Sequence, residues 1–154
     1  MIEIEELTSL LPHRGKMLLL SRVNMYDMEE RRLEAEYHVT KDCLFYDSAA
    51  GGVPAWVGFE LIAQAISALA GLRSRQRGEK PRIGFIMSVS SLRIKIPFFI
   101  TGTTLEIRVK EQGCMDMVYS FEGSVFLEGG KVLEGNLMVM DVDEKQAKIF
   151  ENGE

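Results

Sequence analysis

The sequence has few of the residues that build covalent or metal-bound frameworks. Its 154 residues include only two cysteines, Cys43 and Cys114, and two histidines. The two cysteines do not have the spacing of a metal site, and they are too few to form a disulfide framework. We therefore expect no metal or other cofactor, and a reducing, cytoplasmic compartment. A chain of this length buries enough surface to fold as one domain over residues 1–154 without such staples.

An excess of positive charge is also absent. The formal net charge of −5 argues against a general nucleic-acid binder. The first residues, Ile2–Glu6, are acidic where a secretory signal would be basic, so no signal peptide is expected. One apolar stretch, Val53–Leu72, has the length of a membrane span. It contains Pro54, Glu60 and Gln64, and a central carboxylate costs about 2.5–3.5 kcal/mol on insertion scales. A buried helix in a globular domain is the better interpretation.

The residue pattern indicates one long helix between two groups of strands. Residues 55–77 read as a helix that is apolar on almost every side at first, so the rest of the protein must wrap it. Clean alternation over 31–39 predicts a half-buried strand. The other expected elements are a short helix at 4–11, strands at 17–25, 83–89, 92–96, 105–110, 117–127 and 132–140, and a turn at Gly129-Gly130. These elements predict an α+β fold with a core over about 8–141 and a polar tail at 142–154.

The segment from Phe45 to Glu60 carries the features of a possible site. Gly51-Gly52 allows a tight loop, and Pro54 suits the first turn of a helix. The amides at a helix start can stabilise an oxyanion. Glu60 follows as the only charged side chain between Ser48 and Leu72, which is typical of acid–base chemistry. The alternative is a structural carboxylate that is hydrogen-bonded to Gln64.

Three motifs resemble those of a known family. They are Leu10-Leu11-Pro12-His13-Arg14 followed by Met17–Val23, Pro54-Ala55 followed by Glu60-Leu61-Ile62-Ala63-Gln64, and Lys95-Ile96-Pro97 with Gly102. Together they resemble the 3-hydroxyacyl-acyl-carrier-protein dehydratases over about residues 8–140. The tract Gly51–Gly58 is similar to the divergent dehydratase-like proteins of aryl polyene clusters. The resemblance implies a hot-dog fold, in which a sheet wraps one helix and two subunits pair to form the sites.

The same resemblance assigns roles to individual positions. Glu60 matches the family's catalytic acid, and Ala55 matches the glycine whose amide polarises the thioester carbonyl. The histidine that serves as base lies fourteen positions before the acid, where this chain has Tyr46. Tyrosine is a poor general base near neutral pH. Asp47, the next residue, is a second candidate for that position.

Other residues near these motifs have weaker assignments. We expect Val53, Pro54, Ala55, Trp56 and Gln64 to contact substrate. His13 matches a family position outside the catalytic pair, so a structural hydrogen bond is expected for it. His38 lies on the polar face of the strand at 31–39 and is expected to be solvated. Cys43 has no visible base or cation beside it and is expected to be inert.

Two broader patterns admit two interpretations each. Residues 73–82 hold five cations and one carboxylate, which would suit an acidic carrier protein or simply complement a helix C-terminus. The methionines are typical of core packing but would also suit an acyl tunnel. They include Met17, Met87, Met115, Met117, Met138 and Met140.

These observations predict a protein similar to a 3-hydroxyacyl-[acyl-carrier-protein] dehydratase, in fatty-acid or aryl polyene type biosynthesis. The expected partners are an acyl carrier protein, which brings substrate on phosphopantetheine, and a second subunit in a dimer or higher even oligomer. Because the usual histidine is replaced by Tyr46, a non-catalytic subunit paired with an active homologue is an alternative. A hot-dog acyl thioesterase, in which Glu60 activates water, is another.

Overall fold

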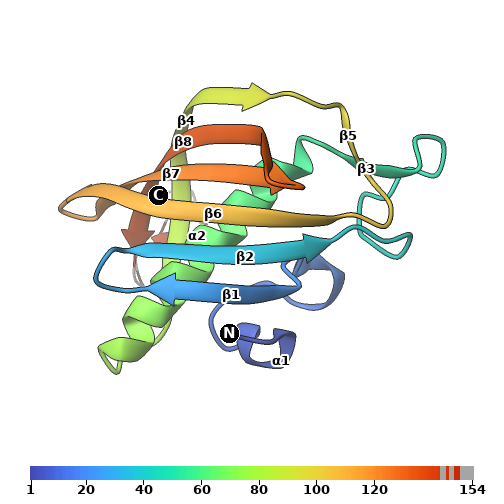
Figure 1. The fold of residues 1–154 in the computed structure, drawn as a ribbon. Helices are drawn as coiled ribbons and strands as arrows, with labels where there is room; N and C mark the ends of the chain where they lie inside the picture. Colours follow the sequence, from blue (N-terminus) through green and yellow to red (C-terminus); the bar gives the residue numbers. More distant parts are fainter. Residues whose placement is uncertain (143–144, 146–147, 150–154) are drawn as a thin grey trace.

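Six antiparallel strands form one curved sheet that wraps a long helix (Figure 1). The computed structural model describes residues 1–142, 145, 148 and 149. The sheet order is β1-β2-β6-β7-β8-β4. The strands are β1 Arg22–Asp27, β2 Arg32–His38, β4 Ile83–Ile94, β6 Thr104–Met115, β7 Val118–Leu127 and β8 Gly130–Val142.

The long helix α2, Val57–Gln76, lies behind the sheet in the view of Figure 1 and packs against β2, β6 and β7. Leu61, Ile62 and Leu69 are fully buried. The sheet approaches the helix closely at Gly123 on β7, where a Cβ atom would lie 2.4 Å from the Ile62 side chain. Burial of this apolar helix is the main source of hydrophobic stabilisation in the fold.

The N-terminal segment covers another side of α2. It contains the short helix α1, Ile4–Leu7, and the 3₁₀ turn η1, Gly15–Met17. At Gly71, a Cβ atom would lie 2.4 Å from the carbonyl oxygen of Leu10. Only glycine allows this approach of the two backbones. The contact holds residues 7–13 against the helix, which matters for the site described below.

A second, two-stranded sheet joins the loop before α2 to the main fold. It pairs β3, Gly52–Pro54, with β5, Phe98–Ile100. Val53 and Phe99 are partners in this ladder and both are fully buried. The ladder therefore fixes where α2 begins.

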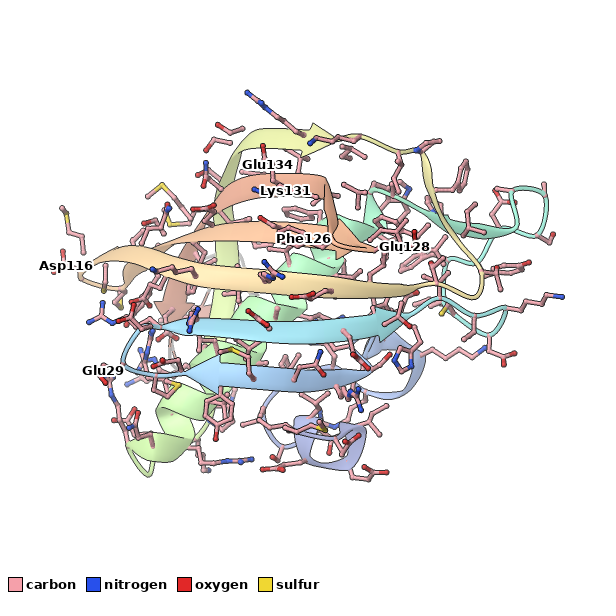
Figure 2. All side chains as sticks on the ribbon, in the orientation of Figure 1. Glu29, Asp116, Phe126, Glu128, Lys131 and Glu134 are labelled. Carbon is pink, nitrogen blue, oxygen red and sulfur yellow. The ribbon has the colours of Figure 1, made fainter. Side chains whose placement is uncertain are left out.

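The outer face of the main sheet is polar. Figure 2 shows Phe126, Lys131 and Glu134 on the face turned away from α2. The Arg108 guanidinium lies 4.2 Å from the centre of the Phe126 ring, and Lys131 pairs with Glu134 at 3.0 Å. Charged side chains that cover an aromatic ring in this way are typical of a solvent-facing sheet surface.

The edge strand β4 is different, because it exposes large apolar side chains along most of its length. Ile86, Met87, Val89, Leu92 and Ile94 are each between 37% and 52% exposed. The main sheet ends at β4, so its outer backbone edge has no neighbouring strand in a single chain. A long apolar edge strand is a surface on which another strand can pair.

Most of the expected elements are confirmed. The helix expected at 55–77 is α2, and the strand expected at 31–39 is β2. The strand expected at 17–25 is wrong in its first part, because the 3₁₀ turn at Gly15–Met17 delays it until Arg22. The strands expected at 83–89 and 92–96 form the single strand β4, with a bulge between Ser90 and Arg93. Most of the predicted polar tail lies outside the described residues, namely 143–144, 146–147 and 150–154.

Two other expectations concern the side chains. The interpretation of the methionines as core filler is wrong for most of those named, since Met17, Met87, Met115, Met117 and Met138 are 40% to 77% exposed. Among the described helices, none is long and apolar enough to cross a membrane. The apolar stretch Val53–Leu72 instead supplies β3 and most of α2.

Candidate active site

Glu60 lies in the first turn of α2 and lines a cavity of about 180 Å³. Its side chain is 36% exposed. The cavity runs along one face of α2, which contributes Ala63, Ser67 and Ala70. The opposite wall comes from β4, β7 and β8, the part of the sheet on which α2 packs least. The residues of that wall are Arg82, Gly84, Ile86, Tyr119, Phe121, Val139 and Asp141.

A buried amide holds the Glu60 carboxylate. Gln64, one turn further along α2, is fully buried and donates from Nε2 to Glu60 Oε1 at 3.3 Å. The same nitrogen donates to the Met17 carbonyl at 2.8 Å, and Gln64 Oε1 accepts from the Leu19 amide at 2.9 Å. Gln64 therefore ties the segment after η1 to the helix and orients Glu60. Its amide is occupied by protein groups, which is the geometry of a positioning residue.

His13 lines the same cavity. Its Nε2 atom lies 3.6 Å from Glu60 Oε1, and its side chain is 23% exposed. The sequence predicted a structural hydrogen bond for this residue. Among the described residues, Nδ1 is buried and has no hydrogen-bond partner. The other histidine, His38, is on the outer face as expected and pairs with Glu36 at 2.8 Å.

The helix start differs from the sequence prediction in one respect. The amide of Ala55 donates to the Pro97 carbonyl at 2.9 Å, because the β3–β5 ladder continues past Pro54. This amide is therefore not available to a substrate carbonyl, and the oxyanion role predicted for it needs correction. Within the described part of the chain, the amides of Trp56 and Val57 have no hydrogen-bond acceptor. Trp56 is 55% exposed, whereas Val57 is fully buried, and neither is among the residues that line the cavity with Glu60. Of the two, the Trp56 amide, just before this 20-residue helix, is the candidate to bind an oxyanion.

The loop with the two candidates for the base position lies near the start of the helix. Phe45 packs edge-to-face on Trp56, with ring centroids 5.2 Å apart, so this loop contacts the residue just before α2. Neither Tyr46 nor Asp47 is among the described residues that line the cavity with Glu60. The Asp47 carboxylate accepts hydrogen bonds from the amides of Ala49 and Ala50, at 2.9 and 3.3 Å. Asp47 thus stabilises its own loop.

The other predicted substrate contacts fall into two groups. Val53 is fully buried and Ala55 nearly so, and both side chains belong to the packed core. Pro54 is half-buried. Trp56 is 55% exposed and is the most accessible side chain of this group.

The far end of the cavity is charged. Arg73, at the C-terminal end of α2, pairs with the buried carboxylate of Glu111, which Arg31 also binds at 3.0 Å. The Arg73 guanidinium also lies 4.8 Å from the centre of the Tyr119 ring. Burial raises the pKa of the Tyr119 phenol.

A second ion pair lies at the same end, between Arg82 and Asp141 at 3.1 Å. Burial raises the pKa of Asp141, and the nearby arginines oppose that shift. Arg75 binds Glu6, so among the described residues three of the five cations at 73–82 have carboxylate partners. Most of the positive charge of this segment is therefore paired with carboxylates from other elements.

The sequence analysis did not single out Glu111, although the pattern contains a signal for it. Leu105, Ile107 and Val109 alternate inward along β6, and the next inward position is Glu111. A carboxylate on the buried face of a strand predicts a buried cation partner. In the part of the chain that the structure describes, no three acidic, histidine or cysteine side chains are placed to hold a metal ion.

Comparison with known proteins shows the family of the chain. The family model described as ApeP dehydratase, of the ApeP-like family, matches residues 5–151. The chain belongs to the ApeP-like dehydratase family. It is also 28% identical over 144 residues to the 3-hydroxyacyl-[acyl-carrier-protein] dehydratase FabZ of Erythrobacter litoralis, with 92% of this chain and 93% of the relative covered. The FabZ protein of Cronobacter sakazakii is 30% identical over 141 residues, with 89% and 91% covered.

Solved structures show the same architecture. A chain of the dehydratase heterocomplex ApeI:P from Xenorhabdus doucetiae aligns with a TM-score of 0.85 at 24% identity, over 95% of this ApeP-like chain and 97% of that one. The phenylacetic acid degradation protein PaaI of Thermus thermophilus aligns with a TM-score of 0.60 at 18% identity, over 81% and 95%. The fold is the hot-dog fold that the sequence resemblance implied.

The hydrogen bonds of Gln64 lead to a stability prediction. Replacing Gln64 with leucine leaves the buried Leu19 amide and Met17 carbonyl without partners, and we expect a loss of about 1–3 kcal/mol in the free energy of unfolding. Urea denaturation measures this loss. The matched control is Gln112→Leu, since Gln112 is exposed on β6 and its side chain donates to Glu122 on the sheet surface. Equal midpoints for the two variants would contradict the positioning role of Gln64.

Proposed function

We propose that this ApeP-like chain is a subunit of a dehydratase that removes water from 3-hydroxyacyl thioesters carried by an acyl carrier protein. The observation that carries the proposal is Glu60, which is held by Gln64 at the wall of a mostly apolar cavity. The acid lies one turn from the free amides of Trp56 and Val57. An acid beside an oxyanion site is what elimination next to a thioester carbonyl requires.

In this mechanism the helix start binds the thioester carbonyl. Negative charge develops on that oxygen as the proton at C2 departs, and the amide of Trp56, at the positive end of the helix dipole, stabilises it. Glu60 protonates the hydroxyl that leaves from C3. The acyl chain lies along the apolar face formed by Ala63, Ile66 and Ala70.

The substrate class is supported by the family and by the FabZ relatives, whose names specify carrier-protein substrates. Phosphopantetheine would then be part of the substrate and not a resident cofactor. Exposed cations near His13, namely Arg14 and Lys16, lie on the segment that borders the cavity. They provide a positive surface on which an acidic carrier protein can dock.

A paired subunit completes the proposal. The apolar edge of β4 borders the cavity through Ile86, so a strand paired there covers the cavity as well as the edge. A second copy of this chain would bring its own Tyr46 loop to that interface. The likeness to a heterocomplex, together with tyrosine at position 46, favours a second candidate in which the paired subunit is a homologous dehydratase.

The role of Glu60 predicts a specific loss of activity. Glu60→Gln keeps the shape of the side chain but removes its proton, so we expect kcat to fall about 10²- to 10⁴-fold with the melting temperature nearly unchanged. The assay follows enoyl product from a 3-hydroxyacyl thioester. Glu122→Gln is the control, because Glu122 is exposed on β7. Undiminished turnover by Glu60→Gln would leave only the structural interpretation of this carboxylate.

The edge strand predicts association. Light scattering of the purified chain should give at least twice the chain mass of 17.4 kDa. Val89→Lys should weaken this association, since it places a charge on the exposed edge, whereas Ile4→Lys, on the exposed helix α1, should not. A monomer when alone that forms a stable complex with ApeI of the Xenorhabdus heterocomplex would select the second candidate. A monomer in both cases would contradict pairing through β4.

A further inference from the structure

We propose that the exposed rings of Phe45 and Trp56 form the surface on which the thioester sulfur and the adjoining pantetheine arm of the substrate lie. The inference rests on the proposed dehydration and deepens it, because it names the residues that select a pantetheine thioester. Trp56 contacts the substrate directly, and Phe45 is a positioning residue that holds the indole.

The position of the Trp56 indole follows from the bonding of its own amide. This amide is the candidate donor to the thioester carbonyl, and among the described residues it has no acceptor. The side chain of the same residue begins only two bonds from the amide nitrogen. A carbonyl oxygen that accepts this hydrogen bond at about 2.9 Å therefore brings the rest of the thioester within reach of the indole.

The two substituents of the thioester carbonyl leave in different directions. The acyl chain extends into the apolar cavity beside Ala63, Ile66 and Ala70. The sulfur leads back to the carrier protein, which is too large to enter the cavity, so this end of the substrate lies toward solvent. The Trp56 indole is on the solvent side as well, since it is 55% exposed and is not among the described residues that line the cavity.

A contact between two aromatic rings holds the indole in place. Phe45 packs edge-to-face on Trp56 with ring centroids 5.2 Å apart, and Phe45 is itself 39% exposed. Two adjacent exposed rings give a rigid apolar surface, and sulfur makes favourable contacts with aromatic rings. The planar amide groups of the pantetheine arm can lie flat against the same surface.

The backbone of Phe45 is strained, and core packing does not explain the strain. The Tyr46 amide donates to the Cys43 carbonyl at 3.1 Å and closes a turn in which Phe45 has a φ of 54° to 73° among the left-handed residues of the chain, namely 73°. This conformation favours glycine and is costly for an aromatic residue. Such strain is found where a functional position requires it. Here it places a ring against Trp56 at the outer surface, where both rings stay partly exposed.

The main chain around Trp56 is fixed before a substrate binds. On one side, the Ala55 amide donates to the Pro97 carbonyl at 2.9 Å. On the other, the Trp56 carbonyl accepts from the Phe59 amide at 3.1 Å in the first turn of α2. The indole and the free amide are held by the same stretch of backbone, so a thioester that binds the amide meets the indole.

The chain has a single tryptophan, which makes the binding step directly observable. Octanoyl pantetheine serves as the probe, because it has no 3-hydroxyl group and cannot be dehydrated. We expect a saturable change in tryptophan fluorescence with this probe, and about tenfold weaker binding of the S-ethyl thioester of octanoic acid, which lacks the arm. Phe45→Gly removes the ring and relieves the backbone strain, and it should weaken binding of the probe about threefold to tenfold.

Turnover gives the second readout. On 3-hydroxyoctanoyl pantetheine, Trp56→Ala should raise KM about tenfold and change kcat less than about threefold, since the contact is present in the ground state and the transition state alike. Trp56→Phe should restore most of the lost affinity. With the S-ethyl thioester the change in KM should be much smaller, so the preference for the pantetheine arm is lost. Tyr26→Ala is the control, because Tyr26 is an exposed ring on β1.

Each outcome decides the proposal. Unchanged wild-type fluorescence, equal binding of the two octanoyl thioesters, or a Trp56→Ala variant that keeps its KM would overturn it and leave the dehydration untouched. A lower mass of Trp56→Ala in light scattering would assign the rings to a subunit interface and would also overturn it. Should Trp56→Ala fail to fold, the probe affinity of Phe45→Gly decides, with an unchanged affinity contradicting the proposal. Arm-dependent binding by a wild type that is inactive alone and with ApeI would support the arm site and overturn the dehydration.

Discussion

The burial of α2 is the constraint on which the rest of this structure depends. A helix that is apolar on nearly every side needs a cover on every side. β2, β6 and β7 cover one side, and the N-terminal segment covers another. Toward β8 and β4 the cover of a single chain is incomplete. The cavity and the exposed apolar edge both lie there. The incomplete packing of α2 on this side therefore accounts for both the candidate site and the surface on which a second subunit can pack.

Local periodicity was enough to predict the main elements. The all-round apolar pattern of residues 57–76 identified the helix, and strict alternation identified β2 and β6. The boundary near Met17 was wrong, because a run of apolar residues looks the same whether it forms a strand or a turn followed by irregular chain. The exposed methionines were misassigned for a related reason. Composition gives no information on which apolar residues lie at an edge.

The site was predictable in part. Glu60 was recognisable as the one charge in an apolar stretch, and Gln64 as its neighbour on the same helix face. The contact between His13 and Glu60 joins residues 47 positions apart, and no local pattern encodes it. The amide of Ala55 was not free as expected, because it donates to the Pro97 carbonyl at the end of the β3–β5 ladder. Tertiary backbone pairing decided that point.

The ion pair of Arg73 and Glu111 limits the length of an apolar guest by electrostatics. Arg73 lies thirteen positions after Glu60 along α2, which corresponds to a rise of about 20 Å. A chain that reaches further must displace the Arg73 guanidinium from a carboxylate that is almost completely shielded from water. Breaking an isolated buried pair costs about 3–5 kcal/mol, and the cost here is smaller because Arg31 still binds Glu111. Each additional buried methylene returns only about 0.8 kcal/mol. A guest only one or two methylenes too long therefore binds less tightly than one that stops short of the pair, because those methylenes return less than the charge separation costs. The length of the guest is limited by the cost of separating the charges as well as by contact with the cavity wall.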